Sequence, residues 1–301
     1  MDSRPKLVFG NIWNTVSAHL TSTALHSNAA VAMYAVDSFR QLSIHFLKFK
    51  ELDVFEFQRR FLKPLETVMR QCDHSSVKEL LLKCVEQTIL LYGQGNSTTM
   101  SLNHQGSLSS TTSIVTAETK EERDTLRSGW KPVMAVIGIA SQDDDNMIAE
   151  LGFQMLTSQL KHFIHVHNDD NAIAKSPTVV VLIAERFVDL VDALLMYVSS
   201  PKCEQMSLST MEHLVTLCHY LADPSIPLPA TKKQPSGEAL ELWWPILLGL
   251  WRTVGDAHTN IRVQALSTLF NVIHKHFYQI TKDLNGNLNE EEKVRSVGNV
   301  Q

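Results

Sequence analysis

Residues 130–152 read WKPVMAVIGIASQDDDNMIAELG, and residues 243–265 read WWPILLGLWRTVGDAHTNIRVQA. Each segment begins with tryptophan, has proline at its third position, and carries a small residue, Gly152 or Ala265, 22 residues after that first tryptophan. In both, a short polar turn separates two apolar stretches. This layout predicts a pair of antiparallel helices in which a bulky side chain on one helix meets a small residue on the other.

Two more segments share the register of tryptophan, proline and small residue. The first of them starts at Leu62, which takes the place of the tryptophan. The second starts at Trp13 and has Thr15 in place of the proline. We expect the prolines in the first turn of their helices, where N–H groups have no intrahelical partner. A helical hairpin buries only one face, so neighbouring hairpins must stack. The predicted anchors are Trp13, Ala35, Leu62, Pro64, Cys84, Trp130, Pro132, Gly152, Trp243, Pro245 and Ala265.

These repeats predict an all-α fold of the HEAT/armadillo-like helical-hairpin solenoid class, with an all-α bundle and a coincidental register as the alternative. Apolar residues at steps of three and four recur along the chain, and we expect about ten helices. Asn28 or Ser27 is placed to cap one of them. Residues 178–183 are rich in β-branched side chains but run directly into a helical pattern, so helix is expected there too. One such stripe consists of Val31, Ala35, Phe39, Leu42 and Phe46.

The composition of the chain predicts six segments. Helical repeats are expected over residues 1–92 and 125–223, and a helical hairpin over residues 238–283. Residues 93–124 are rich in Ser and Thr and predict a disordered insert, with a phosphorylatable loop at residues 107–116 as the alternative. Residues 224–237 predict a proline-rich linker, and residues 284–301 a polar tail.

The charge balance of the chain argues against a nucleic-acid partner. Its formal net charge is −5 and its pI about 6.2, with 44% hydrophobic residues. The four cysteines form no Cys-x-x-Cys pair and are expected to be reduced thiols. No signal peptide and no run of 18 apolar residues is visible, so a cytosolic location is expected.

The polar clusters of the sequence predict no catalytic residue, no cofactor and no metal site. Two histidine pairs are spaced two residues apart and therefore do not face each other on a helix. The acidic run at residues 143–145 lacks the glycine and distal glutamate of a calcium loop, and helix capping explains it better. The two pairs are His165 with His167 and His274 with His276.

Three polar residues merit separate attention as a candidate protein-interaction site. Asp37, Arg40 and Gln41 lie off the apolar stripe of their helix, and Asp37 can reach the other two at i+3 and i+4. One interpretation is an ion pair that fixes helix stacking. The other is a contact surface for a GTPase or for another domain of the same protein.

Residues 34–43, YAVDSFRQLS, together with FL at 46–47, EL at 51–52, FEFQ at 55–58 and FLKP at 61–64, resemble a known signature. It is that of the first homology-downstream-of-Sec7 domain in large ARF guanine-nucleotide exchange factors, a family that includes the brefeldin A-inhibited exchange proteins. RSGWK at 127–131, AS at 140–141 and ELGFQ at 150–154 resemble the next hairpin of that domain. WWPIL at 243–247 and IR at 261–262 resemble the opening of the second such domain.

This resemblance implies a non-catalytic, regulatory region of a cytosolic exchange factor that is peripheral at the Golgi and trans-Golgi network. Its implied partners are a GTP-bound ARF-type small GTPase and other domains of the same exchange factor. The chain departs from the family in lacking the exchange domain with its catalytic glutamate, so we expect it to be part of a longer protein. The alternative is a generic HEAT-like scaffold in another trafficking or transport complex.

Overall fold

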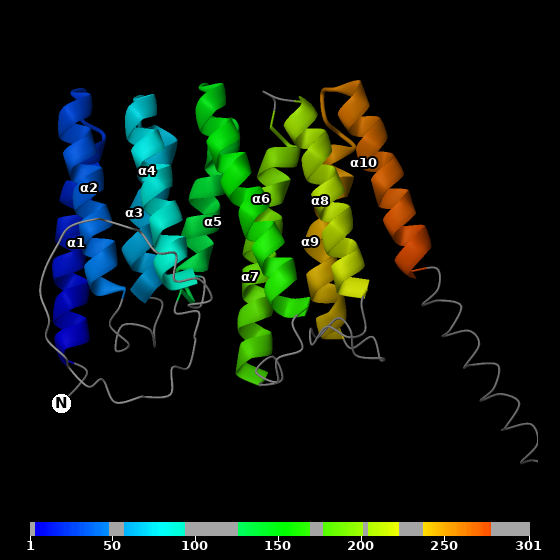
Figure 1. Ribbon diagram of the computed structural model, residues 1–301, viewed down its shortest axis with the longest axis horizontal. Coiled ribbons are helices and arrows are strands. Elements are labelled where there is room, and N and C mark those ends of the chain that lie inside the picture. Colours follow the sequence, from blue (N-terminus) through cyan, green and yellow to red (C-terminus); the bar gives the residue numbers. More distant parts are fainter. Residues whose placement is uncertain are drawn as a thin grey trace, which may run out of the picture. The chain divides into compact units, whose positions relative to one another are not determined.

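Ten α-helices account for most of residues 4–47, 57–93, 126–168, 177–200, 204–222 and 237–277, the parts of the chain that this computed structural model describes. No strand occurs among them (Figure 1). The predictions of an all-α fold, of about ten helices and of helix at residues 178–183 are confirmed. The helices are α1 (Arg4–Ala24), α2 (Ala29–Phe46), α3 (Phe57–Gln71), α4 (Ser75–Thr88), α5 (Trp130–Ile139), α6 (Asn146–Asn168), α7 (Pro177–Val198), α8 (Glu204–Ala222), α9 (Gly237–Thr253) and α10 (Thr259–Val272). Shorter helical turns follow three of them, namely η2 (Ile89–Gly93), η3 (Ala140–Gln142) and η6 (Ile273–Phe277).

The chain divides into two compact units, residues 1–133 and residues 134–301. The predicted insert, linker and tail lie outside the described residues, apart from Gly93, which ends η2, and Gly237, which begins α9.

Aromatic rings join the first three helices of unit 1. The Trp13 ring of α1 stacks on the Phe61 ring of α3, with centroids 4.1 Å apart, and meets the Phe39 ring of α2 edge-on at 6.1 Å. All three side chains are buried. Within this unit α1 packs on α3, and α2 lies beside α4 (Figure 1). Two antiparallel pairs of helices are thereby stacked, and each covers an apolar stripe of the other.

Unit 2 repeats this arrangement with α7 against α9 and α8 against α10. The Phe163 ring of α6 lies 6.1 Å from the Phe187 ring of α7 and 5.5 Å from the Tyr220 ring of α8. Tyr197 of α7 is fully buried, and its hydroxyl donates to the Ala149 carbonyl at 3.0 Å. Burial raises the pKa of Tyr197, so the hydroxyl stays protonated and remains a donor.

Serine hydroxyls satisfy the carboxyl end of α7. The last carbonyls of a helix lack intrahelical partners, and inside a protein each needs a donor. Ser141 donates its hydroxyl to the Met196 carbonyl at 3.0 Å, and Ser207 donates to the Tyr197 carbonyl at 3.1 Å. Ser200, just after the helix, donates back to the Ser141 carbonyl at 2.7 Å. These bonds attach η3 and α8 to the end of α7.

Side-chain oxygens cap two of the helices at their amino ends. The predicted cap Asn28 is confirmed, since its side chain accepts from the Ala30 N–H at 2.9 Å. In the acidic run before α6, Asp143 accepts from the Asp145 N–H at 3.0 Å and Asp145 accepts from the Met147 N–H at 2.9 Å. The bond from the Met147 N–H, in the first turn of α6, supports the capping interpretation of the run, because first-turn N–H groups lack intrahelical acceptors.

Candidate functional site

The predicted bulky anchors are all buried and lie at similar distances from the carboxyl ends of their helices. Each anchor therefore lies about the same number of residues before the turn that leads into the next helix. Counted to the last residue of the helix, Trp13 lies 11 residues from Ala24, Leu62 9 from Gln71, Trp130 9 from Ile139 and Trp243 10 from Thr253.

The placement of the prolines differs from the prediction at two of three positions. Pro132 is the third residue of α5, in the expected first turn. Pro64 and Pro245 lie in the interior of α3 and α9, so the first-turn prediction is wrong for them. Both helices begin earlier because residues before the proline, Phe61 in α3 and Leu242 in α9, are themselves buried and extend the apolar face upstream. That burial offsets the hydrogen bond which an interior proline removes.

The predicted small residues Ala35, Cys84, Gly152 and Ala265 are likewise buried. Gly152 has the least room. A Cβ there would lie 2.7 Å from the Ala140 Cβ and 3.2 Å from the Ile137 carbonyl oxygen, and would overlap the Tyr197 hydroxyl. Close approach to α7 and η3 thus requires glycine at this position.

The candidate interaction residues of α2 form one hydrogen-bonded group. Arg40 donates through Nε to Asp37 Oδ1 at 2.7 Å, and Gln41 donates through Nε2 to Asp37 Oδ2 at 2.7 Å. Both carboxylate oxygens are therefore occupied within the helix. These hydrogen bonds, the one from Arg40 first, lower the pKa of Asp37, so the carboxylate stays ionised.

Arg40 also connects this group to the next hairpin. Its Nη1 donates to Gln87 Oε1 of α4 at 3.4 Å, and Tyr92 in η2 donates its hydroxyl to the Ile44 carbonyl of α2 at 2.6 Å. Cys84 of α4 is buried, and burial raises the pKa of its thiol to about 12. The geometry matches the ion-pair interpretation, in which Arg40 helps to hold α2 against α4. The outward side of the same group stays accessible, since the Asp37 side chain is 36% exposed.

One exposed aromatic residue beside this group was not singled out as a site residue from the sequence. Tyr34 of α2 is 78% exposed, one helical turn before Asp37 and two turns before Gln41. The available signal was its position on the polar side of the helix, away from Ala35 and Phe39. We define the α2–α4 surface as Tyr34, Asp37, Arg40 and Gln41 of α2 with Gln87 of α4.

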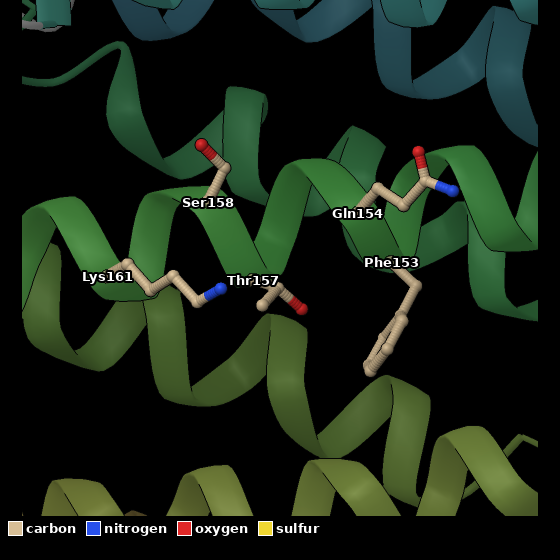
Figure 2. Close-up of a pocket in the computed structure, with 5 residues that line it drawn as sticks. All are labelled: Phe153, Gln154, Thr157, Ser158 and Lys161. Atoms are coloured by element: carbon tan, nitrogen blue, oxygen red, sulfur yellow. The ribbon is translucent and has the colours of Figure 1, made fainter.

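A groove of about 400 Å³ runs along α6 in unit 2, lined by Phe153, Gln154, Thr157, Ser158 and Lys161 (Figure 2). Phe153, Thr157 and Lys161 project from one side of the helix in that view. The Phe153 ring stacks on the His213 ring of α8 at 6.1 Å, and the buried Thr157 hydroxyl oxygen has no hydrogen-bond partner. Burial lowers the pKa of His213. The lining offers one cation and hydroxyl and amide groups, which suit contact with a polar ligand rather than covalent catalysis.

The predictions of no metal site and no membrane span can be compared with the structure only over the described residues. Among these, no group of three or more His, Cys, Asp and Glu side chains is arranged to hold a metal ion. No described helix is both long and apolar enough to cross a bilayer. His276 packs against Trp243 and His219, with ring centroids 5.4 Å from each, while the side chains of His165 and His167 lie outside the described residues.

The family profile of the Mon2/Sec7/BIG1-like HDS domain matches residues 45–96 and 106–158, about a third of the chain. HDS denotes homology downstream of Sec7. The matched part of this chain is similar to a Sec7-like HDS region. It includes α3, α4, α5 and much of α6, and it confirms the resemblance seen in the sequence.

Curated relatives extend the similarity of the HDS region to nearly the whole chain. Brefeldin A-inhibited guanine nucleotide-exchange protein 1 of Arabidopsis thaliana is 26% identical over 293 residues, covering 91% of this chain and 15% of the relative. ADP-ribosylation factor guanine nucleotide-exchange factor sec71 of Schizosaccharomyces pombe is 23% identical, covering 91% and 13%. Brefeldin A-inhibited guanine nucleotide-exchange protein 1 of Bos taurus is 23% identical, covering 93% of this chain and 13% of the relative. The chain therefore spans about one seventh of the length of these relatives.

Proposed function

We propose that this chain is a non-catalytic regulatory and interaction region of a large ARF guanine-nucleotide exchange factor that acts in Golgi vesicle trafficking. Its α2–α4 surface binds a GTP-bound ARF-type small GTPase or another domain of the same exchange factor. The protein works in the cytoplasm, peripheral to the Golgi and trans-Golgi network. The similarity to brefeldin A-inhibited exchange proteins supports the exchange-factor context.

One observation carries the choice of surface, namely the exposed Tyr34 ring beside a preorganised polar group. Tyrosine is enriched among residues that dominate binding energy, because it buries a large ring and still offers a hydroxyl. Asp37 and Gln41 are held by hydrogen bonds before any partner arrives, so little side-chain entropy remains to be lost on binding. A rigid array of this kind suits recognition of another protein.

Regulation requires that the surface bind two states of its partner unequally. A GTPase changes the conformation of its switch segments between the GDP and GTP forms, and a surface that contacts those segments distinguishes the forms. Preferential binding to the GTP form shifts the exchange factor toward the state in which the α2–α4 surface is free to bind. The GTP-bound GTPase that exchange produces would thereby promote further exchange.

The test is binding of the purified chain to GTP-loaded and GDP-loaded ARF on liposomes. We expect preference for the GTP form and a loss of at least about tenfold in affinity with Tyr34→Ala, the size of a typical interface hot spot. Met147→Ala is the matched control, because Met147 is similarly exposed, at 74%, but lies on α6. Equal binding to both forms, or an equal effect of the two variants, would reject the GTPase version of the proposal.

A nucleotide-exchange assay addresses the non-catalytic part of the proposal. We expect the chain alone to leave the rate of nucleotide release from ARF at its intrinsic value. Stimulation above that rate would contradict this. Recovery of cargo or adaptor proteins, with no GTPase, in a pull-down with the chain would favour a generic scaffold instead.

A further inference from the structure

A row of basic side chains runs along α3 in unit 1, although the chain as a whole carries a formal net charge of −5. The helix reads FQRRFLKPLETVMRQ and contains four basic residues and one acidic residue. Three of the basic residues and the acidic one follow one another at steps of four, three and four positions. At about 100° per residue these four side chains fall within an arc of about 60°. They are Arg59, Lys63, Glu66 and Arg70.

This row lies on the side of α3 opposite its apolar face. Phe61 and Leu65 are buried, and the Phe61 ring stacks on the ring of Trp13 in α1. The mean direction of the three basic side chains is about 160° away from that of Phe61 and Leu65. All three basic residues are exposed, whereas Glu66 is only partly so. The row therefore faces away from the helix on which α3 packs.

A fourth cation comes from the start of α5. Two hydrogen bonds hold the segment before α5 against the first turn of α3. The Arg59 N–H donates to the Ser128 hydroxyl at 3.4 Å, and the Gly129 N–H donates to Gln58 Oε1 at 3.3 Å. Lys131 follows Gly129 by two residues and is exposed. These bonds thus place its ammonium group beside the row on α3.

The environment of Glu66 shows that the four cations act together. Burial raises the pKa of the Glu66 carboxyl, and four positive charges around it act in the opposite direction. All four are therefore near enough to act on one group, and a single partly buried carboxylate cannot neutralise them. We name these four cations the α3 stripe. They are Arg59, Lys63 and Arg70 of α3 and Lys131 of α5.

The spacing of the α3 stripe fits a row of carboxylates. Guanidinium groups bind carboxylates through two parallel hydrogen bonds, and ammonium groups bind them as point charges. From Arg59 to Arg70 the stripe extends about 16 Å along the helix axis. The cations of α3 stand at steps of four and seven residues. A helix with carboxylates at the same two steps would meet all three and leave a gap opposite Glu66.

Two features favour an acidic protein segment over a membrane or a nucleic acid. Helices that bind membranes usually insert large apolar side chains, and none of those exposed among the described residues lies on α3 or α5. A lipid surface or a duplex presents negative charge continuously, and would set some of it against Glu66. A protein segment can place a neutral side chain at that point.

We propose that the α3 stripe is a docking site for an acidic helical segment of a protein partner, whose carboxylates pair with the four cations. The stripe is separate from the α2–α4 surface, because α3 packs mainly on α1 whereas α2 packs on α4. Both surfaces are therefore available at the same time. The inference goes beyond the proposed function and does not depend on it.

Fluorescence anisotropy of the full chain with a labelled peptide tests the proposal. The matched peptide is an alanine-rich helix of about 20 residues, long enough to be helical, with glutamates at steps of four and seven. The comparison peptide has the same composition, with its glutamates spread around the helix. We expect the matched peptide to bind at least about threefold more tightly in about 50 mM salt. Binding should weaken in about 500 mM salt, because salt screens exposed charges.

Paired variants locate the site. Lys63→Gln together with Arg70→Gln should weaken binding of the matched peptide about 2- to 30-fold, because each exposed ion pair contributes a factor of about 1.4 to 5. Lys78→Gln together with Lys83→Gln, on α4, removes the same charge and should leave binding unchanged. Circular dichroism confirms that each variant remains helical. Should the α3 variant lose helicity, the two peptides on the wild-type chain still decide the question.

Three results would overturn the inference. A wild-type chain that binds neither peptide, or both equally, has no docking site for a row of carboxylates. An equal loss of binding in the α3 and α4 variants would indicate a general effect of charge. Finally, the stripe is a membrane or nucleic-acid contact instead if phosphatidylserine vesicles or duplex DNA bind more tightly than the matched peptide and only the α3 variant abolishes that binding.

Discussion

Replacing Gly152 by alanine tests the tight contact at the centre of unit 2. The new methyl group would overlap the Tyr197 hydroxyl and would lie 2.7 Å from the Ala140 Cβ. The Tyr197 side chain is fully buried, and its hydroxyl donates to the Ala149 carbonyl at 3.0 Å. The methyl group therefore displaces either the tyrosine ring, with loss of that hydrogen bond, or the backbone of η3.

The expected change in the free energy of unfolding combines one stabilising and two destabilising contributions. Alanine in a helix interior is favoured over glycine by about 1 kcal/mol. Inserting a methyl group into a close-packed core costs about 1–3 kcal/mol, and leaving a buried hydrogen-bonding group unpaired costs about 1–3 kcal/mol. The net expectation is a loss of about 3 kcal/mol. Replacing Tyr197 by phenylalanine removes the overlapping oxygen, so Gly152→Ala should cost about 1–2 kcal/mol less in that background.

Urea unfolding followed by circular dichroism measures these changes as shifts of the transition midpoint. Gly10→Ala provides the matched control, because Gly10 also lies within a helix, α1, but a Cβ there meets no atom within 4 Å. The control should be neutral or stabilising by up to about 1 kcal/mol. The reasoning is refuted if Gly152→Ala stabilises the chain as much as the control does, or if the Tyr197→Phe background leaves its effect unchanged.

Three further predictions concern charged and titrating groups. Arg40→Ala should lower the free energy of unfolding by less than about 1 kcal/mol in urea titrations, because its pairing group is partly exposed; a loss of several kcal/mol would contradict this. Burial lowers the pKa of His219 and of His276, so below about pH 6.5 the unfolded chain binds more protons than the folded chain. The contribution of these groups to stability is therefore complete above about pH 6.5 and is lost as the pH falls below it. Thermal melts between about pH 7.5 and 5.5 should show this loss, with a smaller slope for His276→Gln. Burial raises the pKa of Cys84 and of Cys218 to about 12, so at about pH 8 a thiol reagent should modify them only after urea is added, and rapid labelling of the folded chain would disprove it.

Local patterns in the sequence were sufficient to predict the helical class, the approximate number of helices and the cap at Asn28. Helical periodicity and capping depend on residues within a few positions of one another, so they are visible without tertiary information. The pairing of Asp37 with Arg40 and Gln41 was predictable for the same reason, since all three lie within two turns of one helix.

Exposure required the tertiary structure, because it depends on whether another helix covers a given turn. Val31 belongs to the predicted apolar stripe of α2, yet it is 36% exposed, whereas Ala35 and Phe39 of the same stripe are buried. Phe270 likewise continues a helical apolar pattern and yet is exposed. A stripe identifies the apolar side of a helix but not the neighbour that covers it.

The amino-acid sequence by itself determined that this chain is a series of helices with a repeated register of bulky and small residues, since these features rest on short-range spacing. Only the tertiary structure decided that Pro64 and Pro245 lie inside their helices, that Arg40 bridges to Gln87, and that Tyr34 faces outward. Each of these depends on how far apolar burial extends along a helix and on which helix becomes its neighbour. Such contacts join residues tens of positions apart, and no local pattern specifies them.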